Sequence, residues 1–257
     1  MTMKFPTKPE VKLRNAPLEE VVCQVRFPSI LRVSKDSPTE FQEAIRARFP
    51  ELRIEQGFIV QLPGVVGSEK PAVETGSKSY RFFTPDGKSH IALNPDFIAL
   101  SIKHYTHWGD FQHDFGLATQ ALLKAYQPSY ATRIGLRFIN RFTRKNTGCK
   151  NPSELLDLFR PEITCLLRAQ AWTEPVEMLS QIILREKQGK LALRSGFGRD
   201  QNERFFILDF DYFEEGQLPL DRLTQRIERY HSRIYDAFRW CLLDESLARF
   251  APLQEDK

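Results

Sequence analysis

The stretch from Ala131 to Phe142, near the middle of this 257-residue chain, limits what the chain can fold into. Its side chains alternate in polarity with a period of two, which is the pattern of a β-strand and not of a helix. One face is largely apolar, with Thr132, Ile134, Leu136, Phe138 and Phe142. The opposite face carries Arg133, Arg137 and Arg141. Guanidinium groups need carboxylates, phosphates or water as partners, so this face is a candidate anion-facing surface.

The predicted elements on either side of this strand follow nearly the same order. The first half reads as a strand, a helix, a three-stranded meander and a long helix, at residues 18–27, 37–49, 80–105 and 108–126. A short strand at 58–62 and an exposed loop at 63–79 precede that meander. The second half reads as strand 131–142, short helices at 153–159 and 162–167, strands at 176–185, 190–195 and 204–213, and a long helix at 220–243.

This order predicts an α+β fold of antiparallel sheets with long helices packed on one face. We interpret it as two pseudo-repeats of β-α-meander-α, with a first lobe at 1–129 and a second at 130–257, together forming one compact unit. In support, Val25-Arg26-Phe27 resembles Leu136-Arg137-Phe138. One extended sheet and two sheets related by a pseudo-twofold axis both satisfy this pattern.

The composition narrows the class of protein. The net charge of +4 is mild, so it permits nucleic-acid binding without arguing for it. The four cysteines are scattered without a CxxC spacing, which is typical of reduced thiols. The first residues lack an apolar leader, and no run is long enough to span a bilayer. We therefore expect a soluble, cytoplasmic protein that does not interact with membranes.

The arginine face is the first candidate site, and Arg26 in the first strand corresponds to Arg137 in the central one. The candidates for binding an anion, a nucleic acid or an acidic partner are Arg26, Arg133, Arg137 and Arg141. The alternative is structural. Asp209 and Asp211 share one face of strand 204–213, and an Arg–Asp ladder follows if that strand lies beside 131–142.

Evidence for catalysis is sparse. Asp209 and Asp211 could hold a divalent metal ion for phosphoester chemistry, but two carboxylates two residues apart are a weak motif. The cluster His104, His107, Asp110 and His113 has three-residue steps, yet it falls at a predicted helix start, where Thr106 or Asp110 serves as the cap and such residues are usually solvated. No phosphate-binding loop or nucleophile motif is present. We predict no metal and no cofactor, and we lean against an enzyme.

The helix at 220–243 offers a different role. Leu223, Ile227, Tyr230 and Ile234 recur at steps of three and four, as in a coiled-coil seam between two copies in a homodimer. The alternative is that this stripe packs on the second meander of the same chain. A structural subunit assembling through this helix is one of the functions left open.

Several of these stretches resemble a sporadically distributed, uncharacterised bacterial protein family of about 250 residues. The resemblance rests on Ala16–Val22, on Val25-Arg26-Phe27, on the central stretch from Arg133 to Asn140, on Leu208–Asp211, and on Phe238 with Asp244–Leu247. It covers nearly the whole chain and brings no established activity. Its patchy distribution implies an accessory component of a defence or toxin–antitoxin system.

These observations lead to one expectation of function with two alternatives. We expect a non-catalytic binding protein that engages an anionic ligand, a nucleic acid or a partner protein through its basic sheet face. A metal-dependent nucleotide or phosphoester enzyme using Asp209 and Asp211 is the first alternative. The structural subunit is the second.

Overall fold

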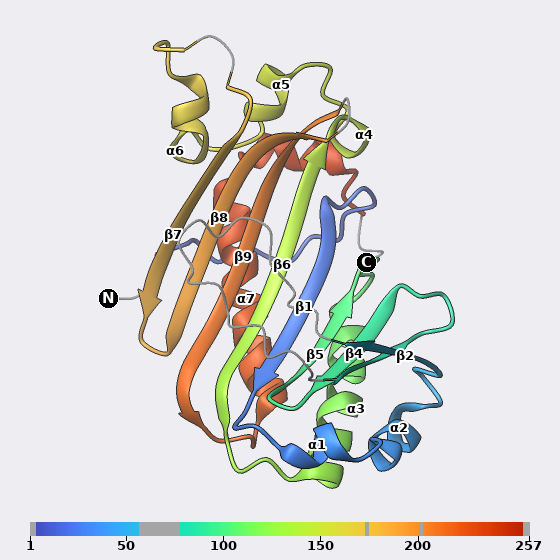
Figure 1. Cartoon of the computed structure of the whole chain (residues 1–257). Coiled ribbons are helices and arrows are strands. Elements are labelled where there is room, and N and C mark those ends of the chain that lie inside the picture. The colour runs from blue at the N-terminus through green and yellow to red at the C-terminus, as the bar shows by residue number, and fades with distance from the viewer. Residues whose placement is uncertain (1–3, 57–77, 173–174, 201–202, 254–257) are drawn as a thin grey trace. The chain divides into compact units, whose positions relative to one another are not determined.

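The computed structural model describes residues 4–56, 78–172, 175–200 and 203–253 (Figure 1). The predicted strand at 58–62 and nearly all of the predicted loop at 63–79 lie outside these residues. The strands are β1 Leu18–Arg26, β2 Glu51–Gln56, β3 Lys78–Phe83, β4 Ser89–Asn94, β5 Phe97–Ile102, β6 Ala131–Thr143, β7 Met178–Glu186, β8 Gly189–Asp200 and β9 Glu203–Leu218. The helices are α1 Leu31–Lys35, α2 Thr39–Ile45, α3 Trp108–Tyr126, α4 Arg144–Thr147, α5 Pro152–Leu156, α6 Pro161–Thr164, η1 Cys165–Arg168, α7 Leu223–Cys241 and η2 Asp244–Phe250.

The described strands form one antiparallel sheet in the order β2-β3-β4-β5-β1-β6-β9-β8-β7. The predicted fold class, antiparallel sheets with long helices packed on one face, is therefore wrong. Strands hold 38% of the residues and helices 33%, and among the described helices only α3 and α7 exceed seven residues. A local period of two shows which residues form strands, but it does not show which strands pair. The pairing of the strands decides the architecture.

The two meanders occupy corresponding places in this strand order. β1 lies beside β5, the last strand of the meander β3–β5, and β6 lies beside β9, the last strand of the meander β7–β9. β2 is added outside β3 and pairs with it from Glu51 opposite Phe83 to Gln56 opposite Lys78. As a result, β2 and β7 are the two edge strands of the described sheet.

By their contacts, the described residues group into two compact units. The first contains the chain up to residue 19, residues 137–213 and the chain from residue 228 onward. The second contains residues 20–136 and 214–227. The predicted lobes at 1–129 and 130–257 follow the order of the elements instead, and they stay a prediction.

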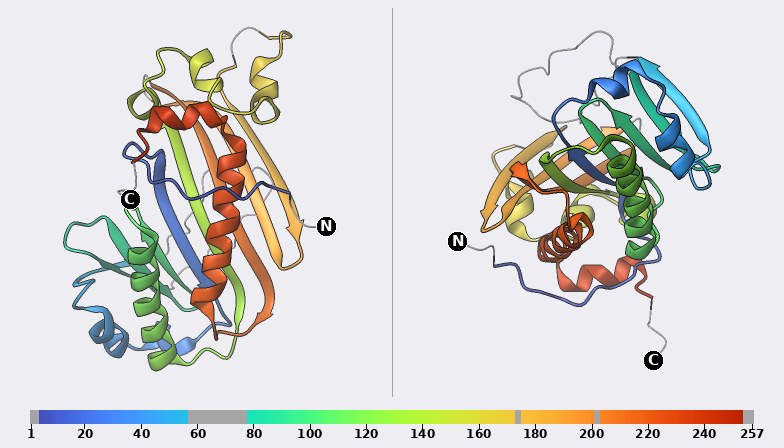
Figure 2. Two further views of the ribbon diagram at one scale, coloured as in Figure 1. Left: turned by 180° about the vertical axis from the view of Figure 1, so that it is seen from behind. Right: turned by 90° about the horizontal axis from the view of Figure 1, so that it is seen from below.

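The core of the first unit lies between α7 and one face of its strands (Figure 2). The rings of Tyr212 and Tyr230 lie 4.7 Å apart, and those of Phe210 and Phe238 lie 6.3 Å apart. All four side chains are buried. Because side chains alternate across a strand, the burial of Phe210 and Tyr212 places Asp209 and Asp211 on the opposite face.

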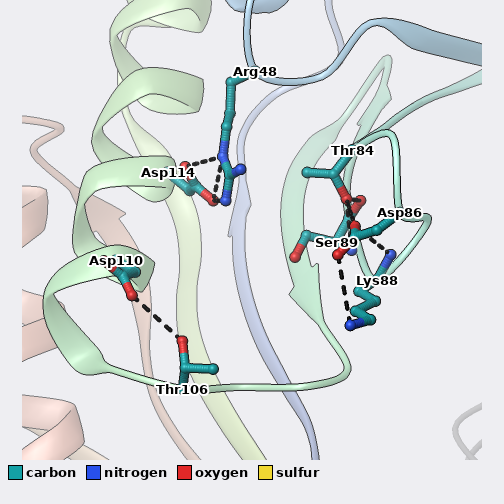
Figure 3. A network of polar contacts seen from close by, with 8 residues as sticks. All are labelled: Arg48, Thr84, Asp86, Lys88, Ser89, Thr106, Asp110 and Asp114. Atoms are coloured by element: carbon teal, nitrogen blue, oxygen red, sulfur yellow. Dashed lines mark hydrogen bonds and ion pairs between the residues drawn. The ribbon is translucent and has the colours of Figure 1, made fainter.

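The second unit is organised by α3, which begins and ends at the predicted residues. His107 caps its start by accepting a hydrogen bond from the Gly109 N–H through Nδ1, at 3.0 Å. The buried carboxylate of Asp114 on α3 accepts hydrogen bonds from Arg48, which follows α2, at 3.1 and 3.3 Å from Nε (Figure 3). The tight turn between β3 and β4 is held separately, by Asp86 accepting from Thr84 at 2.6 Å (Figure 3).

Candidate functional site

The four candidate arginines divide between the two units. Arg137 and Arg141 lie on β6 in the first unit, while Arg26 on β1 and Arg133 on β6 belong to the second. Each unit therefore carries two of the four candidate arginines.

Arg137 is buried and bound to Asp209 of β9. Its Nε and Nη2 donate to Oδ1 and Oδ2 of Asp209, each at 2.7 Å, and the two side chains are 8% and 5% exposed. This is the bidentate pairing for which a guanidinium fork is suited. The predicted internal Arg–Asp partnership is confirmed for this pair.

A second guanidinium shares the same carboxylate. The antiparallel register of β8 and β9 places Arg194 opposite Asp209, and Arg194 Nη1 donates to Asp209 Oδ2 at 3.1 Å. Arg194 Nε donates to Gln181 of β7 at 2.7 Å. Arg137, Asp209, Arg194 and Gln181 form a polar row across β6, β9, β8 and β7, which we call the Asp209 row.

The Asp209 row holds two positive charges and one negative charge. A guanidinium carries five N–H donors, and Arg137 uses one on Nε and one on Nη2 to bind Asp209. Its Nη1 is buried and has no hydrogen-bond partner among the residues that the structure describes. A buried donor without a partner is costly, so an added acceptor would stabilise the row most at this end of Arg137.

Sequence reasoning missed Arg194 and Gln181. Arg194 alternates with Lys190 and Ala192 along strand 190–195, so its face could be read from the sequence. The missing information was the hairpin register. The strands predicted at 190–195 and 204–213 treat residues 196–202 as a connection. In the structure β8 continues to Asp200 and β9 begins at Glu203.

The other candidate arginines are paired near the surface. Arg141 donates to Asp200 at 3.1 Å and lies over the Phe205 ring, 4.2 Å from its centroid. Arg26 donates to Asp96 at 2.9 Å, and both side chains are more than two-fifths exposed. Ion pairs near the surface contribute little to stability. These two arginines therefore have carboxylate partners, but their pairs are not buried as the Arg137–Asp209 pair is.

Arg133 lies along its own strand. A Cβ at Gly135 would stand 2.5 Å from Arg133 Nη1, so the guanidinium occupies the space that the glycine leaves open. A side chain at this position would require the flexible end of Arg133 to move.

The described residues offer little support for a metal centre. Among them no group of three or more His, Cys, Asp or Glu side chains is arranged to hold a metal ion. Asp209 is committed to Arg137 and Arg194, while Asp211 is buried on the same face. In the histidine cluster, His107 acts as the cap of α3, and Asp110 accepts a long hydrogen bond of 3.4 Å from Thr106.

The predicted seam on α7 is used inside the chain. Leu223, Ile227, Tyr230 and Ile234 are between 0% and 6% exposed. Their apolar area is already buried within the chain, which favours the alternative that this stripe packs on the strands of the same chain. The basic residues of the same helix also have acidic partners, since Arg226 donates to Glu214 at 2.8 Å and Arg233 to Glu186 at 2.5 Å.

Comparison with known proteins adds no family to this geometry. No model of a known protein family matches the chain, and no curated protein matches it. Within the described residues, no helix combines the length and apolar character needed to cross a bilayer. The candidate site therefore rests on the Asp209 row itself.

Proposed function

We propose that the protein acts by binding, and that it takes an anionic group at the Asp209 row without catalysing a reaction on it. The observation that carries the proposal is the arrangement of Arg137 and Arg194 around one carboxylate. Two guanidinium groups share Asp209, and Nη1 of Arg137 is buried with no hydrogen-bond partner among the described residues. An oxyanion would supply both the missing acceptor and a second negative charge.

Phosphate chemistry suits this arrangement best. A tetrahedral oxyanion can accept from Nη1 of one guanidinium and remain within Coulomb range of a second, as in phosphate sites built from arginine. Asp209 would stay in place as the group that orients both side chains. The ligand class is therefore a phosphate or a phosphate ester, including the backbone of a nucleic acid.

Thermal unfolding in orthophosphate, compared with chloride at equal ionic strength, tests the proposal. Orthophosphate should raise the unfolding midpoint of the parent protein, because a ligand that binds the folded state stabilises it by mass action. Arg194→Gln should lose that increment. Arg185→Gln is the matched control, because Arg185 is exposed on β7, outside the row, and this variant should keep the increment.

The proposal fails if the parent shows equal midpoints in the two salts. It also fails if Arg194→Gln, still folded, keeps the full increment. A single-stranded oligonucleotide used in the same assay distinguishes a nucleic-acid backbone from the free anion. Its binding should weaken steeply with added salt if backbone phosphates occupy the row.

A further inference from the structure

The apolar surface of the first unit is concentrated in one short part of the chain. Six of the ten large apolar side chains that are exposed among the described residues come from residues 166–183, and they are Leu166, Trp172, Val176, Leu179, Ile182 and Ile183. Their exposed fractions run from 44% to 78%. Isolated exposed apolar residues are ordinary, but three of these six, Leu179, Ile182 and Ile183, lie on one strand and give it an apolar surface.

This surface includes the edge strand β7. Among the described strands, β7 has β8 as its one hydrogen-bonded neighbour, so the backbone groups along its other side have no partner strand there (Figure 1). Leu179, Ile182 and Ile183 are about half exposed on it. Edge strands are usually protected by charged residues or proline, because an unpaired edge is a template for another strand.

The opposite edge of the sheet shows what such protection looks like. β2 reads Glu-Leu-Arg-Ile-Glu-Gln, so a charged residue occupies every second position from Glu51 to Glu55. β7 reads Met-Leu-Ser-Gln-Ile-Ile-Leu-Arg-Glu, and its first seven residues are uncharged. The β7 edge therefore lacks the charges that would discourage pairing with another strand.

Two hydrogen bonds assign the two faces of β7. Gln181 accepts from Arg194 on the face of the Asp209 row, while Ser180 bonds to Ser195 on the face toward α7. By alternation, Leu179, Ile183 and Arg185 share the face of Gln181, as does Glu177 if the strand is continued by one residue. Glu177 and Arg185 are both exposed.

We propose that β7 pairs antiparallel with β7 of a second copy of this chain, about a twofold axis through Gln181. Cross-strand partners lie on the same face, so the two residue numbers of each pair must sum to an even number. Centring on Gln181 places Leu179 opposite Ile183 and Glu177 opposite Arg185, twice each. Centring on Ile182 would set Leu179 against Arg185, and centring on Ser180 would set Glu177 against Ile183.

On the face of Gln181, this register is the complementary one because it matches apolar side chains with apolar ones and unlike charges with each other. It also gives the edge strand β7 a second hydrogen-bonded neighbour, in a sheet that continues across the axis. This inference does not rest on anion binding, although the axis residue Gln181 also belongs to the Asp209 row through its hydrogen bond from Arg194.

Sedimentation equilibrium on the full chain, for the parent and five variants, tests the proposed pairing of β7 with β7 of a second copy. The parent should form a dimer. Ile183→Lys places a charge against Leu179 of the second copy and should leave a folded monomer. Ile54→Lys is the matched control on β2, where Ile54 is 56% exposed compared with 54% for Ile183, and it should leave the dimer intact.

The register is tested by charge exchange between Glu177 and Arg185. Either single change, Glu177→Arg or Arg185→Glu, sets like charges together twice per dimer and should raise the dissociation constant by about tenfold. The double change should return the dissociation constant to within about threefold of the parent value. A monomeric parent, a dimer that survives Ile183→Lys, or single changes that leave the dissociation constant unaltered would each overturn the proposal.

Discussion

Arg137 and Asp209 are joined side-on, Nε to Oδ1 and Nη2 to Oδ2, at 2.7 Å in both bonds. Neither side chain is more than 8% exposed. The pair links the central strand β6 to β9, and Arg194 adds a third charge from β8. A buried ion pair contributes little net stability, but removing one partner leaves the other charge buried and uncompensated.

The first prediction concerns Asp209→Asn, which keeps the size of the side chain and removes its charge. Two guanidinium groups would then be buried or nearly buried without a counter-charge, so the free energy of unfolding should fall by about 3–5 kcal/mol. Urea unfolding measures this. The control Asp200→Asn removes the surface partner of Arg141 and should cost no more than about 1 kcal/mol. Equal stability of the two variants would contradict the role given to Asp209.

The second prediction concerns Arg48 and Asp114 in the second unit. The Asp114 carboxylate is 2% exposed and accepts from Arg48, and this hydrogen bond raises the pKa of the Arg48 guanidinium. Arg48→Met should cost about 1–3 kcal/mol of unfolding free energy, because Asp114 loses its charged partner.

Arg46→Met is the matched control for this change. It removes the exposed pair between Arg46 and Glu43 and should cost less than about 0.5 kcal/mol. If the Arg48 variant were no less stable than the Arg46 variant in the same urea titration, Asp114 would not depend on Arg48.

The third prediction concerns pH. Burial lowers the pKa of His231, on α7 beside the ring of Phe138, to about 4 from an ordinary value of 6.5. The unfolded chain then binds a proton between pH 6.5 and pH 4 that the folded chain does not bind. Stability should therefore fall as the pH drops through this window, by about 3 kcal/mol in total for this one group.

The measurement is the free energy of unfolding at pH 7.5 and at pH 4.5 for the parent and for His231→Leu. The variant should lose less stability on acidification than the parent does. His90, whose pKa burial also lowers to about 4, should keep its own contribution in both proteins. If parent and variant lost the same stability on acidification, the pKa of His231 would be the same in the folded and the unfolded chain.

The fourth prediction separates the core of α7 from the edge of β7. Ile227 is fully buried and Ile183 is about half exposed. Ile227→Ala should cost about 2–5 kcal/mol of unfolding free energy through the cavity it leaves, without changing the oligomeric state of the folded protein. A dimer that dissociates in the folded Ile227→Ala variant, measured by light scattering, would restore the helix seam as an interface.

Much of the local structure could be predicted from the sequence. The long helix from Trp108 to Tyr126 was predicted to the residue, because its apolar side chains recur at helical spacing between two clear ends. The strand Leu18–Arg26 and the central strand Ala131–Thr143 were also predicted, within one residue at each end. Their alternation is strong because one face of each is buried.

The arrangement of these elements could not be predicted in the same way. Strand pairing depends on contacts between residues far apart in the sequence, such as the 72 positions between Arg137 and Asp209. β2 was missed because its apolar residues, Leu52 and Ile54, alternate with charges on an exposed edge. The Arg137–Asp209 pair was predicted as one of two readings from the faces of two strands, but the sharing of Asp209 with Arg194 required the register of β8 and β9.

Equilibrium dialysis of the protein against labelled orthophosphate measures anion binding at the Asp209 row without relying on unfolding. We expect saturable binding of one phosphate per chain, lost in Arg194→Gln and retained in Arg185→Gln. Non-saturable binding by the parent, or saturable binding that Arg194→Gln leaves unchanged, would contradict an anion site at the Asp209 row.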